Sequence, residues 1–249
     1  YLPKQITISN NVATPASKID FTAGNFNFYD GSGQGTMTSK TGDLSNLFGT
    51  SDGMLDTGTV AIDSTYHLFA VYNPTTNLSK PLASLSSTSP TMTLPNADGY
   101  TVLGARIASL LTDSIANILM GDYTFFNDGS YYFEYSQQIL DVSGSPLTTN
   151  AELHPMSLPT GISVIAKLTY YADPIAGSFY TGLVTSPFST NRVPSISDFN
   201  ASVELSGEVR TQKELNIKSD TFGQIRTRWT ATSDISQTIF TIGWLDNNI

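Results

Sequence analysis

The sequence contains no cysteine, which excludes disulfide bonds and thiolate chemistry. It also has no stretch of about 18 apolar residues and no basic start followed by an apolar run, so we expect neither membrane insertion nor a secretory signal. Runs of lysine or arginine are missing, and the net charge is −9. Because nothing in the sequence would neutralise a phosphate backbone, we expect no nucleic-acid partner.

Groups that titrate near neutral pH are scarce, with two histidines in 249 residues. His67 lies within an apolar segment, where we predict a structural imidazole with one ring nitrogen hydrogen-bonded. His154, which we place in a loop, and Glu152 are a weak zinc pair, because four ligands are normally needed. Nucleophile elbows, phosphate-binding loops and calcium-loop spacings are also missing. We therefore expect a protein that is not an enzyme and that holds no cofactor and no metal.

Paired carboxylates leave one catalytic route open, because glycan-cleaving enzymes use two Asp or Glu side chains. Most aspartates have a simpler interpretation as turn caps, since they stand beside or one residue from a glycine: Asp30, Asp52, Asp98 and Asp128. Among the five glutamates, only Glu204 and Glu208 are close in sequence. A pair formed across strands stays open as an alternative.

The residues that are present favour β-structure. Hydrophobic residues make up 39% of the chain and aromatic residues 11%, which is enough for a buried core. Charged residues make up only 13%, while Ser and Thr together supply roughly a quarter. Helical surfaces are normally built from Glu, Lys, Arg and Gln, whereas Thr, Tyr, Phe and Val suit a half-buried sheet.

Alternation of polar and apolar residues predicts about fourteen strands. The segment 66–72 is apolar on both faces except at His67, as in a strand buried on both sides. One short helix is predicted within 39–48, because Leu44, Leu47 and Phe48 recur at helical spacing, and the glycine-rich segment 29–35 is predicted as a loop. The pattern indicates an all-β protein, a β-sandwich or jelly roll of one or two packed units, with at most one or two short helices.

Three segments are expected along the chain, whose length suits one large domain or two smaller ones. Residues 1–38 would form N-terminal strands and a connection to an upstream part. Residues 39–160 would form a β-sandwich module. Residues 161–249 would complete the same sandwich or form a second one.

Aromatic clusters are the remaining candidates for a binding surface. Neighbouring residues on a strand face opposite sides, so each cluster presents some rings outward if its other face is core. Outward tyrosines stack on sugars or on protein surfaces, whereas the alternative is that a second sheet or a neighbouring subunit covers both faces. The candidate receptor-binding residues are Tyr123, Tyr131, Tyr132, Tyr135, Tyr170 and Tyr171.

Short motifs follow one another in a recognisable order from about residue 40 to the C-terminus. They are Gly49–Gly58, Tyr66–Phe69, Asn73–Thr76, Ser89–Thr91, Leu94–Pro95, Gly99–Thr101, Arg106–Ile107, Thr112–Asp113, Asn117–Ile118, Gly223–Arg226 and Thr241–Asp246. In this order they resemble the C-terminal region of large modular tail-fibre and tail-associated proteins of bacteriophages and prophages. The chain departs from that pattern at Ala108, where a glycine is common, and at Asn247-Asn248, which replace a basic tail.

The resemblance implies a receptor-binding module of the virion tail that docks a bacterial surface glycan or protein. It also implies a homotrimer that contacts other tail proteins, assembles in the host cytoplasm and acts at the host cell surface. The motif residues themselves are interpreted as scaffold, with Trp244 filling a core and Arg226 or Arg228 pairing across a sheet. Two alternatives remain: a purely structural virion component, such as a collar, baseplate or head-fibre part, and a glycan depolymerase.

Overall fold

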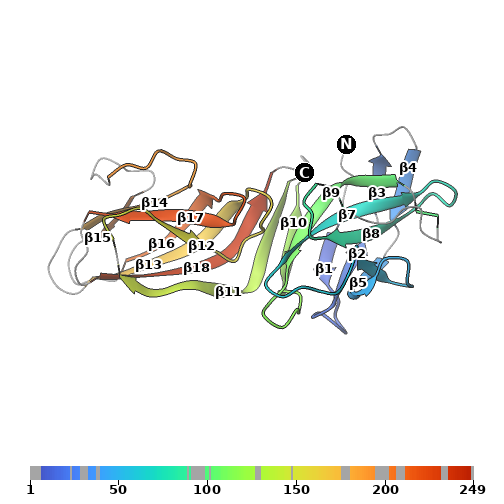
Figure 1. The fold of residues 1–249 in the computed structure, drawn as a ribbon, viewed down its shortest axis with the longest axis horizontal. Helices are drawn as coiled ribbons and strands as arrows, with labels where there is room; N and C mark the ends of the chain where they lie inside the picture. Colours follow the sequence, from blue (N-terminus) through green and yellow to red (C-terminus); the bar gives the residue numbers. More distant parts are fainter. Residues whose placement is uncertain are drawn as a thin grey trace. The chain divides into compact units, whose positions relative to one another are not determined.

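The computed structural model describes residues 7–22, 24–28, 33–37, 40–88, 90, 99–100, 102–126, 130–146, 148–174, 180–193, 202–205, 211–230 and 235–247. The regular secondary structure of these residues consists of β-strands, with no helix, which confirms the predicted all-β class (Figure 1). The described part of the chain contains no helix of the length and apolarity that crossing a membrane requires. The chain divides into two compact units, one of Tyr1–Ser136 with Asp246–Ile249 and one of Gln137–Leu245.

The described residues of the first unit form ten strands and the beginning of an eleventh. They are β1 (Thr7–Asn10), β2 (Lys18–Thr22), β3 (Gly24–Phe28), β4 (Gly33–Met37), β5 (Lys40–Leu47), β6 (Gly53–Leu55), β7 (Thr65–Asn73), β8 (Leu78–Ser84), β9 (Val102–Leu111), β10 (Gly121–Phe125) and β11 (Tyr131–Pro146). Hydrogen-bonded neighbours follow the order β11, β10, β1, β2, β5, β6, β8, β4, β3, while β7 pairs with β8 and β9. Every residue of β7 is buried, as its apolar sequence predicts.

Side chains of β7 and β8 take part in a hydrophobic cluster of the first unit. Phe69, Val71, Leu82 and Tyr100 are buried there, and Phe48 packs against them. The rings of Phe48 and Tyr100 meet edge to face at 5.6 Å. Burying a side chain of this size contributes about 1.5–3 kcal/mol, so this cluster stabilises the unit substantially.

The helix predicted within 39–48 is wrong, because Lys40–Leu47 forms β5. This strand pairs antiparallel with β2 and parallel with β6. Leu47 is 46% exposed, so it does not share a buried face with Leu44. At Gly42 an added Cβ would lie 2.6 Å from Sδ of Met54, which shows how closely the side chain of the neighbouring strand β6 approaches. Pairing on both sides outweighs a helical spacing of three residues.

Two predicted loops are also strands. Residues 33–35 of the glycine-rich segment belong to β4, which pairs antiparallel with β3. His154 lies in β12 (Glu152–Pro155), opposite Ile225. Short strands of this kind have too few alternating residues for their pattern to stand out.

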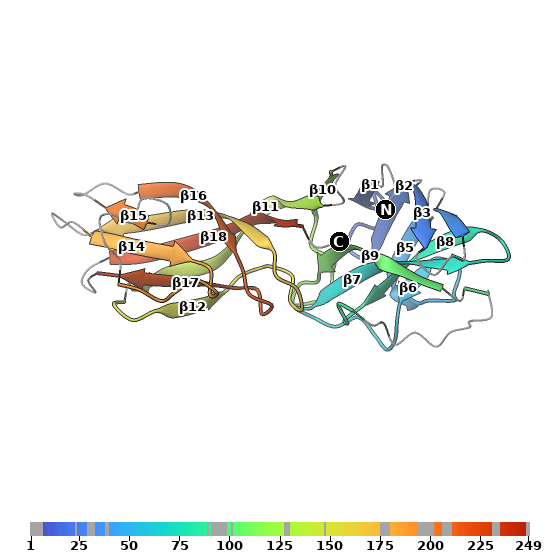
Figure 2. The ribbon, with the colours of Figure 1, turned by 90° about the horizontal axis from the view of Figure 1, so that it is seen from above.

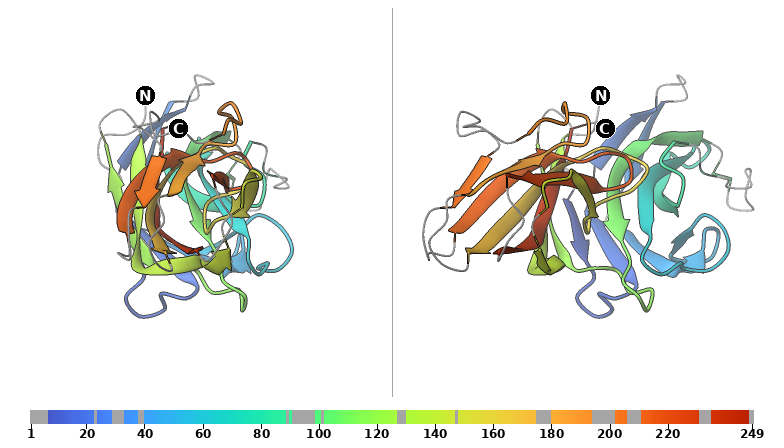
Figure 3. Two further views of the ribbon diagram at one scale, coloured as in Figure 1. Left: turned by 90° about the vertical axis from the view of Figure 1, so that its left-hand side faces the viewer. Right: turned by 60° about the vertical axis from the view of Figure 1, so that its left-hand side comes forward.

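The second unit is a β-sandwich. One sheet runs β16 (Thr211–Lys218), β13 (Ile165–Pro174), β18 (Ile235–Asp246) and β11, and the other runs β12, β17 (Gln224–Trp229), β14 (Tyr180–Thr185) and β15 (Ser202–Leu205). Figures 2 and 3 show the strands of this unit in two layers. Tyr170 of β13 stacks on Trp229 of β17 with ring centroids 6.0 Å apart, which places aromatic packing between the layers. Trp244 is fully buried, as predicted.

Candidate functional site

Three of the six candidate tyrosines point into the protein. Tyr131, Tyr135 and Tyr170 are 0%, 6% and 0% exposed. The hydroxyl of Tyr131 accepts a hydrogen bond from the backbone N–H of Ser109 at 2.8 Å, and that of Tyr170 donates to Gln237 at 3.3 Å. These rings match the alternative interpretation, in which the protein itself covers the aromatic face.

The other three candidates, Tyr123, Tyr132 and Tyr171, are partly exposed. The Tyr123 hydroxyl donates to the carbonyl of Ser109 at 2.9 Å, and burial raises the pKa of that hydroxyl. Tyr132 stands opposite Thr124 on the neighbouring strand, while Tyr171 meets Phe240 edge to face at 5.7 Å. The six tyrosines are divided between the two units, and a role in receptor binding stays a prediction.

A buried polar network surrounds Ser109 in the first unit. Nδ1 of His67 lies 3.0 Å from the Ser109 hydroxyl, and the Arg106 guanidinium binds both that hydroxyl and the carboxylate of Asp246. His67, Ser109 and Asp246 are each 0% exposed. A nucleophile must reach a substrate, so this serine and histidine have no access to one. The predicted structural role of His67 is confirmed.

His154 lies between the layers of the second unit. Its Nε2 is 2.8 Å from the Thr227 hydroxyl, 3.3 Å from the amide nitrogen of Gln237 and 3.9 Å from Oε2 of Glu152. Burial lowers the pKa of His154, although the charge of Glu152 opposes that effect. The amide nitrogen only donates, so Nε2 of the neutral ring is an acceptor. Among the described residues, no three His, Asp or Glu side chains gather as a metal site would require.

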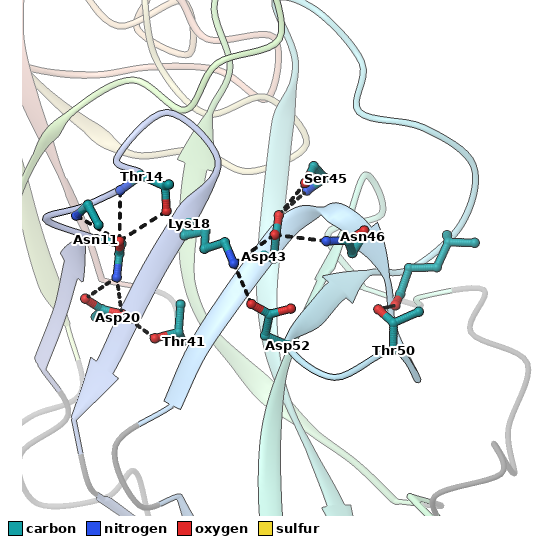
Figure 4. Close-up of polar contacts among 12 residues, drawn as sticks. Asn11, Thr14, Lys18, Asp20, Thr41, Asp43, Ser45, Asn46, Thr50 and Asp52 are labelled. Atoms are coloured by element: carbon teal, nitrogen blue, oxygen red, sulfur yellow. Dashed lines mark hydrogen bonds and ion pairs between the residues drawn. The ribbon is translucent and has the colours of Figure 1, made fainter.

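An ion-paired network joins β2, β5 and the loop between β5 and β6 in the first unit (Figure 4). Lys18 lies between two carboxylates, with Nζ 3.2 Å from Asp43 and 2.6 Å from Asp52. Asp43 also accepts hydrogen bonds from Ser45 and Asn46. Burial opposes ionisation of Asp43, yet the bonds from Ser45 and Lys18 outweigh it and lower the pKa of this carboxyl. The Asp52 side chain, predicted as a turn cap, therefore forms an ion pair, whereas Asp30, Asp98 and Asp128 lie outside the described residues.

Two neighbouring loops of the same unit hold aliphatic side chains out to solvent. Oδ1 of Asn11 accepts the backbone N–H groups of Ala13 and Thr14, and this turn leaves Val12 97% exposed. In the same way, Oδ1 of Asp113 accepts the N–H groups of Ile115 and Asn117, and Ile115 is 73% exposed.

These two loops support each other. The N–H of Ile118 donates to the carbonyl of Ala16 at 2.7 Å, which joins the loop that follows β1 to the loop that precedes β10. Ala116 has a φ of 65°, a left-handed conformation that costs a non-glycine residue about 1–2 kcal/mol. The exposed tips are thus fixed by their surroundings, which suits a contact surface.

The second unit exposes an aromatic side chain in a similar way. Residues 186–189 form a tight turn in which the N–H of Ser189 donates to the carbonyl of Ser186 at 3.0 Å. Pro187 occupies the second position, where its fixed φ suits a turn, and Ser186 occupies the first. Phe188, at the third position, is 65% exposed.

Two arginines of β17 hold the loop that contains this turn. Arg226 donates to the carbonyls of Ser186, Pro187 and Ser189. Arg228 donates from Nε to the carbonyl of Thr149 at 2.9 Å and from Nη1 to the side-chain oxygen of Asn191 at 3.1 Å.

We define residues 186–193 as the arginine-braced loop. Arg226 and Arg228 hold this loop and do not pair across a sheet, which corrects the expectation from sequence. The Ser186-Pro187-Phe188-Ser189 stretch carries a turn signal that would have located the loop.

Comparisons with known proteins supply no functional assignment. Neither a scan against protein-family models nor a search of curated proteins finds a match to this chain.

Proposed function

We propose that the chain is a host-attachment module of a bacteriophage tail fibre, which binds a glycan or a protein on the bacterial surface. The attribution to a phage tail rests on the order of short motifs from about residue 40 to the C-terminus. The all-β architecture of the described residues is compatible with that attribution.

The observation that carries the binding role is the exposure of apolar side chains on braced loops. Phe188 is 65% exposed, and Val12 and Ile115 are 97% and 73% exposed. An exposed apolar side chain on a loop held by internal hydrogen bonds loses little entropy when a partner covers it. Such loops are where binding residues of rigid scaffolds are usually found.

A purely structural role in the virion is the second candidate, and the first unit favours it. Val12 and Ile115 are aliphatic, and carboxylates such as Asp63 and Asp122 lie exposed in the same unit. Aliphatic tips suit contact with another protein better than contact with a sugar, since sugars stack on aromatic rings. This unit would then contact other tail proteins, or further copies of the chain in a homotrimer.

Labelling of intact bacteria by the purified, fluorescent chain tests the attachment proposal. We expect the chain to label some strains of a phage-susceptible panel and to compete with the phage for adsorption. A chain that assembles into virions but labels no susceptible strain would leave the structural role standing and remove the attachment role. Light scattering that gives a monomer at high concentration would contradict the homotrimer.

The same samples test the depolymerase alternative. Purified surface polysaccharide is incubated with the chain, and its length is followed by gel filtration. We expect the length distribution to remain unchanged, and shortened products would overturn the proposal that the chain is not an enzyme.

A further inference from the structure

We infer that the arginine-braced loop and the adjoining face of β17 bind an anionic sugar, a pyranose ring that carries a carboxylate or a phosphate. This inference rests on the proposed attachment function and names the class of ligand. Three features of the described residues support it: an exposed ring on a fixed turn, guanidinium charge that no described carboxylate contacts, and a side-chain amide oriented by one of those guanidinium groups.

The ring of Phe188 is held in place although it lies in solvent. The carbonyls on either side of it, those of Pro187 and Ser189, both accept hydrogen bonds from Arg226. The N–H of Phe188 itself donates to the Ser186 hydroxyl at 3.3 Å. A fixed aromatic face is a suitable platform for the C–H groups of a pyranose, because the π-face carries partial negative charge.

The guanidinium groups beneath this turn contact only neutral oxygens among the described residues. Arg226 binds three backbone carbonyls, and Arg228 binds one carbonyl and one amide oxygen. Arg228 uses Nε and Nη1 in these bonds, so the donors of Nη2 are not engaged by any described group. A guanidinium has five N–H donors in a planar fork that matches carboxylate and phosphate.

The local charge differs from that of the chain as a whole. The chain carries a net charge of −9 and has five arginines, of which Arg192, Arg226 and Arg228 belong to this loop or its supporting strand. Glu152 is the acidic residue of the neighbouring strand β12, and it stands opposite Thr227. Because side chains alternate along a strand, Glu152 lies on the inner face, within 3.9 Å of His154, and not on the arginine face. The two strands that pair with β17, β12 and β14, thus place no carboxylate on the arginine face, and Glu204 of β15 is one strand further away. The charge beside the loop is therefore positive, which favours an anionic ligand.

Asn191 supplies the third feature. Its side-chain oxygen accepts a bond from Arg228, which turns its NH₂ group away from the guanidinium. An amide oriented in this way has two donors for sugar hydroxyls. An apolar surface combined with a few oriented polar groups is the usual make-up of a small-ligand site.

Binding of three defined saccharides to the full chain tests the inference. The probes are oligogalacturonate, its fully methyl-esterified form, and galactose 6-phosphate, each followed by saturation-transfer NMR and calorimetry. We expect at least one of the two anionic probes to bind, and the arm that binds identifies carboxylate or phosphate as the preferred group. Methyl esterification keeps the ring and removes the charge, so we expect it to weaken binding by about tenfold or more.

Matched variants locate the site. Phe188→Ala removes the ring without removing any side-chain hydrogen bond, and Arg228→Gln removes the charge. We expect each to weaken binding of the anionic probe by about tenfold. Phe222→Ala is the control, since Phe222 is 72% exposed on a different loop of the same unit, and we expect its affinity to equal that of the parent chain. Thermal unfolding of every variant separates loss of the site from loss of the fold.

Several outcomes would overturn the inference: no binding of either anionic probe, equal binding by Phe188→Ala and the parent chain, or an equal loss in Phe222→Ala. The attachment function fails separately. If the parent chain and Phe188→Ala label bacteria equally, the sugar site is wrong and attachment stands. If the chain binds an anionic probe at this loop but labels no susceptible strain, the site stands and the attachment function is wrong.

Discussion

Arg106 in the first unit and Arg226 in the second are buried to the same extent, at 9% exposure, yet they contact different kinds of group. Arg106 contacts the carboxylate of Asp246, which is itself 0% exposed. Arg226 contacts backbone carbonyls of a surface loop. Equal burial thus accompanies an ion pair at Arg106 and, among the described residues, only neutral oxygen partners at Arg226.

The group that an arginine contacts, rather than its burial, therefore indicates its role. The two charges of a buried ion pair compensate each other, so removing either partner leaves the other charge buried without compensation and destabilises the fold. A guanidinium that binds carbonyls keeps its charge available to the surroundings. The two units would accordingly respond differently when an arginine contact is removed.

Removing the carboxylate of the buried pair should have the largest effect. We expect Asp246→Ala to lower the free energy of unfolding by about 3–5 kcal/mol, since Arg106 would remain buried without its counter-charge. Urea denaturation followed by far-UV circular dichroism measures this loss. The double variant Arg106→Met with Asp246→Leu is the control, and we expect it to recover much of the loss because no charge stays buried. A loss below about 1 kcal/mol in Asp246→Ala would contradict the structural role of the pair.

Overpacking the inner face of the second unit should have the next largest effect. A Cβ at Gly182 would lie 2.5 Å from ring atoms of Trp229, which is 1% exposed and stacked on Tyr170. We expect Gly182→Ala to cost about 1–3 kcal/mol in thermal or urea unfolding, because the buried ring has to move. Gly144→Ala is the comparison, since nothing lies within 4 Å of its added Cβ and only its φ of 60° opposes the change. An equal cost in the two variants would show that the contact with Trp229 is not what matters.

The sequence was sufficient for the β class and for residues whose pattern extends over many positions. The apolar run 66–72 and Trp244 were predicted as core and are buried, because the hydrophobicity of these residues is enough to predict their burial. The helix predicted within 39–48 is wrong because the strand partners of this segment, β2 and β6, are not visible in local spacing. Strand pairing is a long-range property, and it overrides a weak local signal.

The candidate site was harder to predict for a related reason. Tyrosine clusters show which strands are aromatic, but the face that is covered depends on a second sheet, as the contact of Tyr170 with Trp229 shows. Phe188 lies in a Ser- and Pro-containing turn with no other aromatic residue beside it, so the search for aromatic clusters did not identify it. The bracing arginines lie about 40 residues downstream in the sequence, and only the fold brings them beneath the loop.

Removing Arg226 should loosen the arginine-braced loop more than it destabilises the unit. The freed carbonyls of the loop can be hydrated, so we expect Arg226→Gln to cost about 1 kcal/mol in global unfolding. Amide hydrogen exchange at Ser189 should increase, because the turn loses its anchor to β17. Lys218→Gln, at an exposed lysine of β16 in the same unit, is the control for charge alone, and we expect it to leave exchange at this turn unchanged. Unaltered exchange in Arg226→Gln would mean that the turn is stable without its arginine, and the contrast with Arg106 would then lose its basis.

Acidification should give the smallest effect, and it tests the inner face opposite the arginines. Burial lowers the pKa of His154 below its ordinary 6.5, so the unfolded chain takes up a proton at a higher pH than the folded chain does. The stabilisation is therefore complete above pH 6.5 and decreases as the pH falls from 6.5 through the folded pKa. Asp141 acts in the opposite sense at lower pH, because burial raises its pKa above 3.8 and favours the protonated folded form as the pH falls toward 3.8.

We expect His154→Gln to flatten the slope of unfolding free energy between pH 6.5 and 5.5, measured by urea titration at each pH. A slope that persists in this variant would place the titrating group elsewhere and would contradict the assignment of this pH dependence to His154.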